Sequence, residues 1–296
     1  MEIVVFGAGS LGSLLGGLLA REHDVTLVGR DPHVATVAAD GLTVTGAVDA
    51  TVRPTAVTAL PAAFAADLAL VTVKAYDTAA AAAALSDGDY DAALSVQNGL
   101  GNEATLAAAL DCPVLAGTCT YGAVLDEPGV VRCTGVGEVV LGPPEGGESA
   151  PADRVGAAFD RGGVETTVSA DMPRRLWVKL AVNAGINAPT ALARVENGAL
   201  LDGPATGVAA DAAREAARAA RNEGVDLSNG AAVAAVERVA EATAANTSSM
   251  HQDVLAGRRT EVDAINGVVA DRLEAAPVNR TLSALVRAFE RERGLR

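Results

Sequence analysis

One stripe of side chains stands out for the chemistry that its residue types allow. Lys179, Asn183 and Asn187 are spaced at i, i+4 and i+8, so on a helix they lie on one face. The chain has only two lysines, Lys74 and Lys179, among 23 basic residues. A lysine ammonium can release its proton in a suitable environment, whereas an arginine guanidinium effectively cannot. The stripe therefore places one of the two lysines beside two amides, and we interpret it as a site for a polar ligand.

The alternative for this stripe is a buried hydrogen-bond network between helices. Asparagine is a poor helix former, and Asn183 and Asn187 are flanked by apolar residues, so the pattern favours a ligand site over such a network. A solvated helix face would show charged residues instead.

A second group of polar residues follows later in the chain. Asn197 can contact a substrate or cap a turn, and its spacing favours neither. Ser248 and Ser249 can bind a substrate or cap a helix. Glu261 can act in the chemistry or serve as a favourable acid in the first turn of the helix that it opens. The substrate-binding candidates of this group are Asn197, Asn246, Thr247, Ser248 and Ser249.

A glycine-rich loop near the start is a candidate cofactor site. Gly7, Gly9 and Gly12 form G-x-G-x-x-G between the apolar run "EIVVF" and a predicted helix, a position typical of dinucleotide-binding loops. The second glycine lets a pyrophosphate approach the backbone, and the helix N-terminus presents N–H donors. A tight turn without a ligand is the less favoured alternative. The predicted cofactor-binding residues here are Gly7, Ala8, Gly9, Ser10, Leu11 and Gly12.

The end of the second predicted strand bears on cofactor choice. An acid there can hold the ribose 2′-hydroxyl of NAD, and an arginine can pair with the 2′-phosphate of NADP. The chain has Arg30 followed by Asp31 and Pro32. We interpret Asp31 as the N-cap of the next helix, which leaves Arg30 for the phosphate and favours NADP(H). There are two alternatives to this interpretation: Arg30 is a solvated surface residue, or Asp31 binds the ribose and the cofactor is NAD(H).

The composition limits the class of protein. The net charge of −14 argues against nucleic acid or an anionic membrane as partner, but not against an anionic small substrate. Acid excess with few lysines is typical of adaptation to high salt, although GC-rich coding produces a similar bias.

Aromatic residues make up 3%, so the core must be built from Ala, Val and Leu. The three cysteines and three histidines show no metal-ligand spacing, and no metal site is predicted. An odd number of cysteines suits a reduced cytoplasm.

The order of predicted elements indicates an α/β fold. Strands and helices alternate through the first half, which predicts a Rossmann-type, doubly wound parallel sheet. Strand patterns end near residue 169, and the rest reads as an all-helical C-terminal domain. We therefore predict a cofactor-binding domain over residues 1–169 and a helical substrate-binding and catalytic domain over residues 170–296. The glycines and Glu2 near the N-terminus argue against a signal peptide or membrane span there.

Taken together and in order, several segments resemble the ketopantoate reductase (2-dehydropantoate 2-reductase) family from end to end. They are "GAGSLG", "VTVKAYDT", "SVQNGLGNE", "GTCTYGAVLDEPG", "WVKLAVNAGINAPTAL" and "NTSSMHQDVLAGRRTEVDAINGV". The resemblance implies a two-domain, NADPH-dependent oxidoreductase that reduces 2-dehydropantoate to (R)-pantoate on the route to pantothenate and coenzyme A.

The resemblance also implies roles for single residues. Lys179 is expected to be the catalytic proton donor, and Glu261 an acid near both the cofactor and that lysine. Lys74, Asn98 and Ala123 are expected to lie beside the cofactor, with Asn98 also near the substrate. Arg30 matches the 2′-phosphate arginine. The substrate contacts are expected from Asn183, Asn187, Asn197, Asn246 and Ser249.

This chemistry suits the residues. Hydride addition to a ketone leaves an alkoxide that must be protonated, and Lys179 can both donate the proton and stabilise the developing charge. We expect NADPH as cofactor, with NADH as an alternative, a small-molecule substrate, a cytoplasmic location and a homodimer as an allowed assembly. A dehydrogenase of another small 2-oxo or 3-hydroxy acid and a non-catalytic NADP(H)-binding sensor are the alternatives; the sensor would not need Lys179 together with Glu261.

Overall fold

The computed structural model describes residues 1–296 and divides into two compact units. The first unit comprises Met1–Gln97 and Gly101–Met172, and the second comprises Asn98–Leu100 and Pro173–Arg296. The sequence places the division near residue 169 and does not foresee that Asn98–Leu100 pack with the helical unit.

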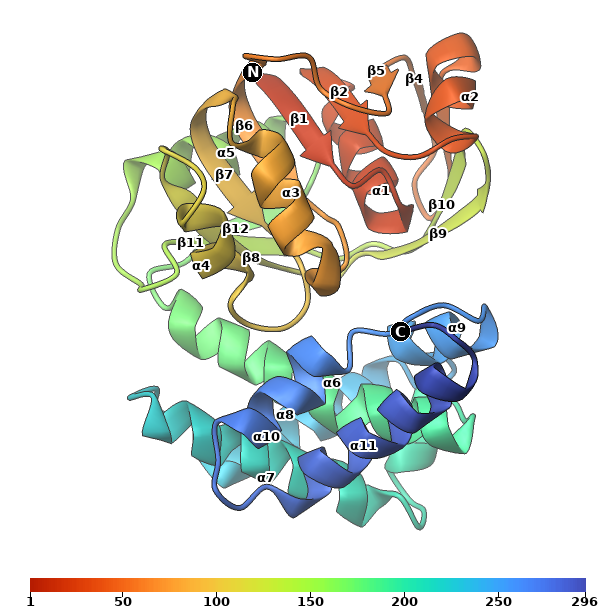
Figure 1. Ribbon diagram of the computed structural model, residues 1–296, viewed down its shortest axis with the longest axis vertical. Coiled ribbons are helices and arrows are strands. Elements are labelled where there is room, and N and C mark those ends of the chain that lie inside the picture. The colour runs from red at the N-terminus through yellow and green to blue at the C-terminus, as the bar shows by residue number, and fades with distance from the viewer. The chain divides into compact units, whose positions relative to one another are not determined.

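The first unit contains a large parallel sheet with helices between its strands (Figure 1). Its elements are β1 (Glu2–Phe6), α1 (Ser10–Leu19), β2 (Asp24–Val28), α2 (His33–Asp40), β3 (Leu42–Gly46), β4 (Ala50–Val52), β5 (Thr55–Val57), β6 (Ala65–Val71), η1 (Ala75–Asp77), α3 (Thr78–Leu85), β7 (Asp89–Ser95), α4 (Asn102–Ala107), β8 (Val114–Cys119), β9 (Gly122–Glu127), β10 (Val130–Gly135), β11 (Val139–Gly142), α5 (Ala150–Arg161) and β12 (Thr166–Val168).

The main sheet has the order β12-β11-β8-β7-β6-β1-β2-β5. Its strands run parallel except where β11 pairs antiparallel with β8. The order reverses at β1, which has β2 on one side and β6 on the other. Ligands of such sheets bind at the carboxyl ends of the strands at this reversal. The predicted Rossmann-type, doubly wound fold is therefore confirmed for this unit.

A second, four-stranded sheet has the order β4-β3-β10-β9, and the sequence analysis missed three of the strands that complete the two sheets. The segment Leu42–Val57 forms β3, β4 and β5, of which β5 extends the main sheet as an edge strand beside β2. The alternation of apolar and polar residues in "LTVTG" is a signal that could have found β3, whereas β4 and β5 have three residues each, too few to show a period.

Helix α1 lies between the two sheets, which explains why its sequence is almost wholly apolar. A Cβ at Gly16 would come within 2.5 Å of Leu27 in the main sheet, and one at Gly17 within 2.9 Å of Val44 in the second sheet. These two glycines therefore let the helix approach both sheets. Eight consecutive residues from Gly12 to Leu19 are buried as a result, and they hold the helix N-terminus in a fixed place.

The second unit is helical throughout, as predicted. Its core is rich in alanine, above all along α7, where small side chains allow close packing against α8. This agrees with the expectation of a core with few aromatics. The elements are α6 (Met172–Ala193), η2 (Asn197–Leu200), α7 (Thr206–Asn222), α8 (Asn229–Ala242), α9 (Ser249–Leu255), the π-helix η3 (Asp263–Gly267), α10 (Val268–Asp271) and α11 (Pro277–Glu292). None of the helices in the structure has the length and apolar character needed to cross a membrane.

Candidate active site

The glycine loop joins β1 to α1 at the point where the sheet order reverses. Gly7 has φ +116°, and a Cβ there would lie 2.7 Å from the Val73 backbone nitrogen, so only glycine fits. The Thr72 hydroxyl donates to the Gly7 carbonyl oxygen at 2.8 Å and fixes the loop from the end of β6. Because α1 begins at Ser10 with Gly9 as its N-cap and no capping side chain, its first N–H groups have no partner within the helix.

Gly9 and Gly12 serve different purposes in this loop. A Cβ at Gly12 would come within 2.2 Å of the Gly7 carbonyl oxygen, so Gly12 is needed by the fold. A Cβ at Gly9 would have no neighbour closer than 4.0 Å, apart from the residues next to it in the chain. The space above Gly9 is therefore open to a ligand, and it borders the donors of the α1 N-terminus. This arrangement fits a pyrophosphate.

The other cofactor candidates of the first unit follow neighbouring strands at the same edge of the sheet. Lys74 follows β6 and Arg30 follows β2, the two strands on either side of β1. Arg30 is almost fully exposed, and its guanidinium lies 3.7 Å from Asp77, which follows Lys74 closely. An exposed ion pair of this length holds the side chain only weakly, so Arg30 can turn toward a phosphate.

The predicted capping role of Asp31 is wrong. Helix α2 begins at His33 with Pro32 as its N-cap, so Asp31 lies one residue outside the helix and is exposed. The case for a 2′-phosphate therefore rests on Arg30 alone and gains nothing from Asp31.

Strand β9 lies next to the glycine loop. The Leu125 backbone nitrogen donates to Ser10 Oγ at 3.1 Å, which ties the first residue of α1 to β9. Ala123 lies two residues earlier on the same strand. The second sheet, which the sequence analysis did not predict in full, thus brings Ala123 toward the loop that begins α1.

In the second unit, Lys179, Asn183 and Asn187 all lie on α6, as the spacing predicts. Asn187 is buried, whereas Lys179 and Asn183 are partly exposed. Trp177, the only tryptophan, is buried two residues before Lys179 and belongs to the core of the unit. The stripe therefore starts on a helix that is anchored by its apolar face.

Asn98 connects this stripe to Glu261. Its Nδ2 donates to Glu261 Oε2 at 3.0 Å, and its Oδ1 accepts a long hydrogen bond of 3.4 Å from Asn183 Nδ2. A Cβ at Gly99 would come within 2.5 Å of the Ala264 carbonyl oxygen, so the loop Asn98–Leu100 packs directly on the segment after Glu261. Glu261 itself is buried. The structure thus brings together Asn98, Asn183 and Glu261, which are far apart in the sequence.

Glu261 does not open a helix in the usual sense, because the element after it is the π-helix η3 with Val262 as its N-cap. The segment around Glu261 is held by α11. The Thr260 backbone nitrogen donates to buried Glu290 at 2.6 Å, and Arg287 Nε donates to Asp263 Oδ1 at 2.7 Å. Burial alone would raise the pKa of the Asp263 carboxyl, but hydrogen bonds from Arg287 and Arg296 hold that pKa below its usual value. Asp263 is therefore a charged side chain that ties the segment after Glu261 to α11 and the C-terminus.

The remaining substrate candidates lie near one another around α9 and η2. Asn197 is buried, its Nδ2 donates to Thr243 Oγ1, and its Oδ1 has no hydrogen-bond partner. Its backbone nitrogen donates to the carbonyl of exposed Asn246. Thr247 is partly exposed, and Ser249 is exposed.

Ser248 has a structural role in this group. It is the N-cap of α9, where its Oγ accepts from the His251 backbone nitrogen at 3.2 Å, and it lies 2.7 Å from Thr190 Oγ1 on α6. Thr190 Oγ1 also lies 2.7 Å from the Ile186 carbonyl oxygen, so this hydroxyl pair ties α9 to α6. The contact of Ser248 with a substrate stays a prediction.

Comparison with known proteins identifies the family. The family model described as ketopantoate reductase PanE/ApbA matches residues 3–146, and its C-terminal counterpart matches residues 171–290. The chain is 46% identical to the 2-dehydropantoate 2-reductase of Halobacterium salinarum, with 99% of this chain and 100% of the relative covered. The chain belongs to the ketopantoate reductase family.

Other ketopantoate reductases agree with this assignment. The enzyme of Pyrococcus horikoshii is 36% identical over 98% of both chains. The crystal structure of a PanE/ApbA family ketopantoate reductase from Ralstonia eutropha JMP134 is 34% identical, has a TM-score of 0.91, and covers 99% of this chain and 100% of its own.

The chain is also similar to a dehydrogenase of another name. A D-mandelate dehydrogenase in complex with NADH is 25% identical with a TM-score of 0.88 and 99% coverage of both chains.

Sequence reasoning missed several polar residues that support the site of this ketopantoate reductase family member. Asn266, Asn279 and Glu215 are almost fully buried and hydrogen-bonded to one another, and Glu290 holds the segment before Glu261. Only Asn266 could have been singled out from the sequence, because it lies in "NTSSMHQDVLAGRRTEVDAINGV", one of the segments that resemble the family. The others lie in helices whose sequences show ordinary amphipathic patterns.

Proposed function

We propose that this protein reduces ketopantoate to (R)-pantoate with NADPH as the preferred hydride source. The observation that carries the proposal is the contact of Asn98 with both Glu261 and Asn183, four residues along α6 from Lys179. Membership of the family and full-length similarity to several 2-dehydropantoate 2-reductases support the same substrate.

The first unit supplies the cofactor site in this proposal. The α1 N-terminus and the open space above Gly9 hold the pyrophosphate, and Lys74 and Ala123 lie beside the rest of the cofactor. Arg30 pairs with the 2′-phosphate, which gives the preference for NADPH over NADH. When bound, the nicotinamide supplies the hydride that is added to the carbonyl carbon.

The second unit supplies the acid and the substrate contacts. Lys179 donates a proton to the carbonyl oxygen and stabilises the negative charge that develops there. Glu261, which accepts from Asn98, is the acid that the proposal assigns to the surroundings of Lys179. Asn183, Asn187, Asn197, Asn246 and Ser249 offer neutral donors for the hydroxyl and carboxylate of the substrate.

The test is the initial rate of NADPH oxidation with ketopantoate, with smaller 2-oxo acids and with the aromatic 2-oxo acid that corresponds to mandelate. We expect the highest kcat/KM with ketopantoate. A higher kcat/KM with another 2-oxo acid would replace the proposed substrate, and no turnover with any of them would favour a non-catalytic binding protein.

A further inference from the structure

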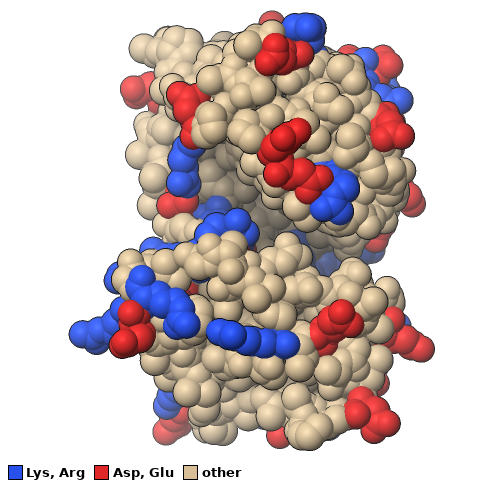
Figure 2. All heavy atoms as spheres, turned by 90° about the vertical axis from the view of Figure 1, so that its right-hand side faces the viewer, with Lys and Arg blue, Asp and Glu red and all other residues tan.

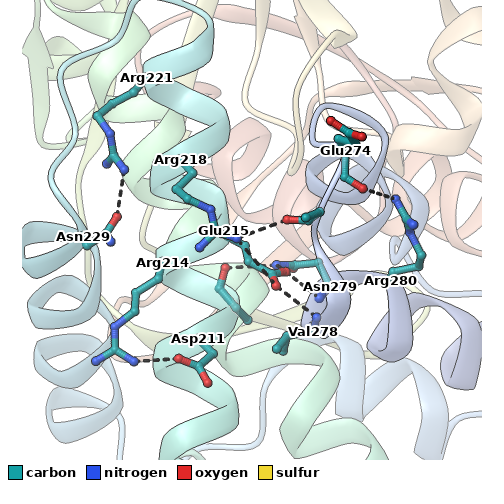
Figure 3. Close-up of polar contacts among 12 residues, drawn as sticks. Asp211, Arg214, Glu215, Arg218, Arg221, Asn229, Glu274, Val278, Asn279 and Arg280 are labelled. Carbon is teal, nitrogen blue, oxygen red and sulfur yellow. Dashed lines mark hydrogen bonds and ion pairs between the residues drawn. The ribbon is translucent and has the colours of Figure 1, made fainter.

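A chain of buried hydrogen bonds runs through the second unit away from the candidate active site. Glu215 on α7 accepts from the backbone nitrogens of Val278 and Asn279 at 3.1 and 2.9 Å, so it caps the N-terminus of α11 (Figure 3). Asn279 Nδ2 donates to Glu215 at 2.8 Å and to the Ala212 carbonyl oxygen at 3.0 Å. Asn279 Oδ1 accepts from Asn266 Nδ2 at 2.9 Å. The chain therefore links α7, α11 and η3.

Asn266 extends this chain to α6. Its Nδ2 also donates to the Ala184 carbonyl oxygen at 3.0 Å, one residue after Asn183. Asn266 has no exposed surface, and its Oδ1 lacks a hydrogen-bond partner. An unsatisfied buried oxygen destabilises the folded protein, so Asn266 is not placed here for stability alone.

The charge of Glu215 fixes the direction of every bond in the chain. A carboxylate only accepts, so Asn279 must present its NH₂ group to Glu215 and its oxygen to Asn266. Asn266 must then present its own NH₂ group, which reaches both Asn279 and Ala184. This explains why the Asn266 oxygen is left without a partner.

Helix α6 needs such support because Pro189 interrupts its hydrogen bonds. Proline has no N–H, so the Gly185 carbonyl oxygen loses its donor within the helix, and the proline ring crowds that carbonyl. The weak point falls inside the stripe that begins at Lys179 and ends at Asn187. Asn266 holds the helix just before this point, at Ala184, and Ser248 holds it just after, at Thr190.

The same asparagine is part of the segment that follows Glu261. The Gly267 backbone nitrogen donates to the Val262 carbonyl oxygen at 2.8 Å, which closes the wide turn of the π-helix around Asn266. Such turns are often found at functional sites, because they change the direction in which a side chain points. Asn266 thus joins the element next to Glu261 to the helix that carries Lys179 and Asn183.

From these contacts we propose that Asn266 is a positioning residue for catalysis, directed by Glu215 through Asn279. It fixes α6 at Ala184 and so keeps Lys179 and Asn183 in place relative to Glu261. The effect on catalysis rests on the proposed function, whereas the effect on α6 does not.

The experiment compares two replacements of Asn266. In Asn266→Asp an oxygen replaces Nδ2 and faces the Ala184 and Asn279 oxygens, so two attractive contacts become repulsive. Asn266→Leu has a similar size and removes both bonds together with the unsatisfied oxygen. Because small displacements of catalytic groups reduce rates strongly, we expect kcat with ketopantoate to fall by about 10- to 100-fold in both, with the KM for NADPH changed less than about twofold.

Hydrogen–deuterium exchange gives a second readout that needs no substrate. Backbone amides of α6 from residue 184 to residue 193 should exchange faster in both variants than in the wild type. The matched control is Asn229→Asp, the same change on an exposed helix start where Asn229 accepts from Arg221 (Figure 3). It should leave both kcat and the exchange of α6 as in the wild type.

Glu215→Gln tests the chain itself and serves if neither Asn266 variant folds. Glutamine has one acceptor oxygen where Glu215 has two, so its NH₂ group must face either the Val278 N–H or the N–H donors of Asn279. Either orientation weakens the hold on the start of α11 and on Asn279, so we expect faster exchange in α6 and a lower kcat. Combined with Asn266→Leu, it should lower kcat no further than Asn266→Leu alone, because both act through the same bonds.

Three outcomes would overturn the inference. They are wild-type kcat in the folded Asn266 variants, unchanged exchange of α6, and additive losses in the double variant; if neither Asn266 variant folds, wild-type kcat or exchange in Glu215→Gln overturns it. A wild-type protein inactive toward ketopantoate would contradict the proposed function instead, and the exchange data would still decide whether Asn266 holds α6.

Discussion

The two units differ sharply in charge. The first has 7 basic and 22 acidic residues, a net charge of −15, whereas the second has 16 basic and 15 acidic residues, a net charge of +1. On the face drawn in Figure 2, acidic side chains dominate the charged surface of the first unit and basic ones gather on part of the second. The acidity of the chain is therefore a property of one unit, not of the whole molecule.

This difference in charge is the opposite of what an anionic cofactor would favour. The acidic unit is the one proposed to bind an anionic cofactor, and it does so with backbone donors and two basic side chains, Arg30 and Lys74. The nearly neutral unit has the proposed proton donor, Lys179. Each of the two lysines of the chain thus belongs to one unit, and each unit should respond differently to substitution and to salt.

The largest expected effect concerns the second unit. Lys179→Arg keeps the positive charge but cannot readily give up a proton. General acid catalysis contributes on the order of 10²–10⁴-fold, so kcat should fall by about that factor while KM changes less. Steady-state kinetics measures this, and the fluorescence of Trp177 checks that α6 is intact. Near wild-type kcat would mean that the proton comes from another group.

The next prediction concerns the glycine loop of the first unit. Gly9→Ala should leave the melting temperature unchanged, because apart from its chain neighbours a Cβ there has only the Gly7 carbonyl oxygen near it, at an unstrained 4.0 Å. It should lower kcat/KM for NADPH by about 10- to 100-fold, the value of a displaced hydrogen bond to a charged group. Gly12→Ala, which clashes with Gly7, should instead lower the melting temperature. A loss of stability in Gly9→Ala with normal cofactor affinity would contradict the assignment of the open space.

Arg30→Ala should have a smaller effect that is specific to one cofactor. We expect the wild type to have a higher kcat/KM with NADPH than with NADH, and the variant to narrow that difference, mainly through the NADPH value. Because the Arg30 side chain is exposed, its removal should lower kcat/KM for NADPH by about tenfold or less. Equal use of both cofactors by the wild type would remove the assigned role of Arg30.

Salt should stabilise the first unit more than the second. Repulsion among its acidic residues is screened as ionic strength rises. All three tyrosines lie in the first unit and the only tryptophan in the second, so the two fluorescence signals report on different units. We expect the tyrosine transition to shift upward by a few degrees across a KCl series, with a smaller shift for Trp177; each 1 kcal/mol corresponds to about 2–4 °C. A flat or falling midpoint for both would indicate that the composition reflects codon usage.

The sequence predicted the fold class and the stripe on α6 because both depend on local patterns. The glycine loop after β1 and the spacing of Lys179, Asn183 and Asn187 are readable from neighbouring residues alone. The hydrogen bond between Asn98 and Glu261 could not be predicted in this way, because it joins positions 163 residues apart. The strands β4 and β5 were missed because three residues are too few for a clear period, whereas β3 was missed although its sequence alternates. Asp31 was misassigned because a one-residue shift of a helix start changes which residue is the cap.

We propose that the first unit binds the cofactor and that Lys179 in the second performs the proton transfer. The most direct test is a titration of NADPH into the wild type, Lys179→Arg and Gly9→Ala, with the dissociation constant obtained from the fluorescence of the bound nucleotide. We predict that Lys179→Arg binds NADPH within about twofold of the wild type although its kcat has collapsed, and that Gly9→Ala binds at least about tenfold more weakly. If Lys179→Arg loses as much affinity as Gly9→Ala, Lys179 acts on the cofactor, and binding and chemistry are not divided between the two units.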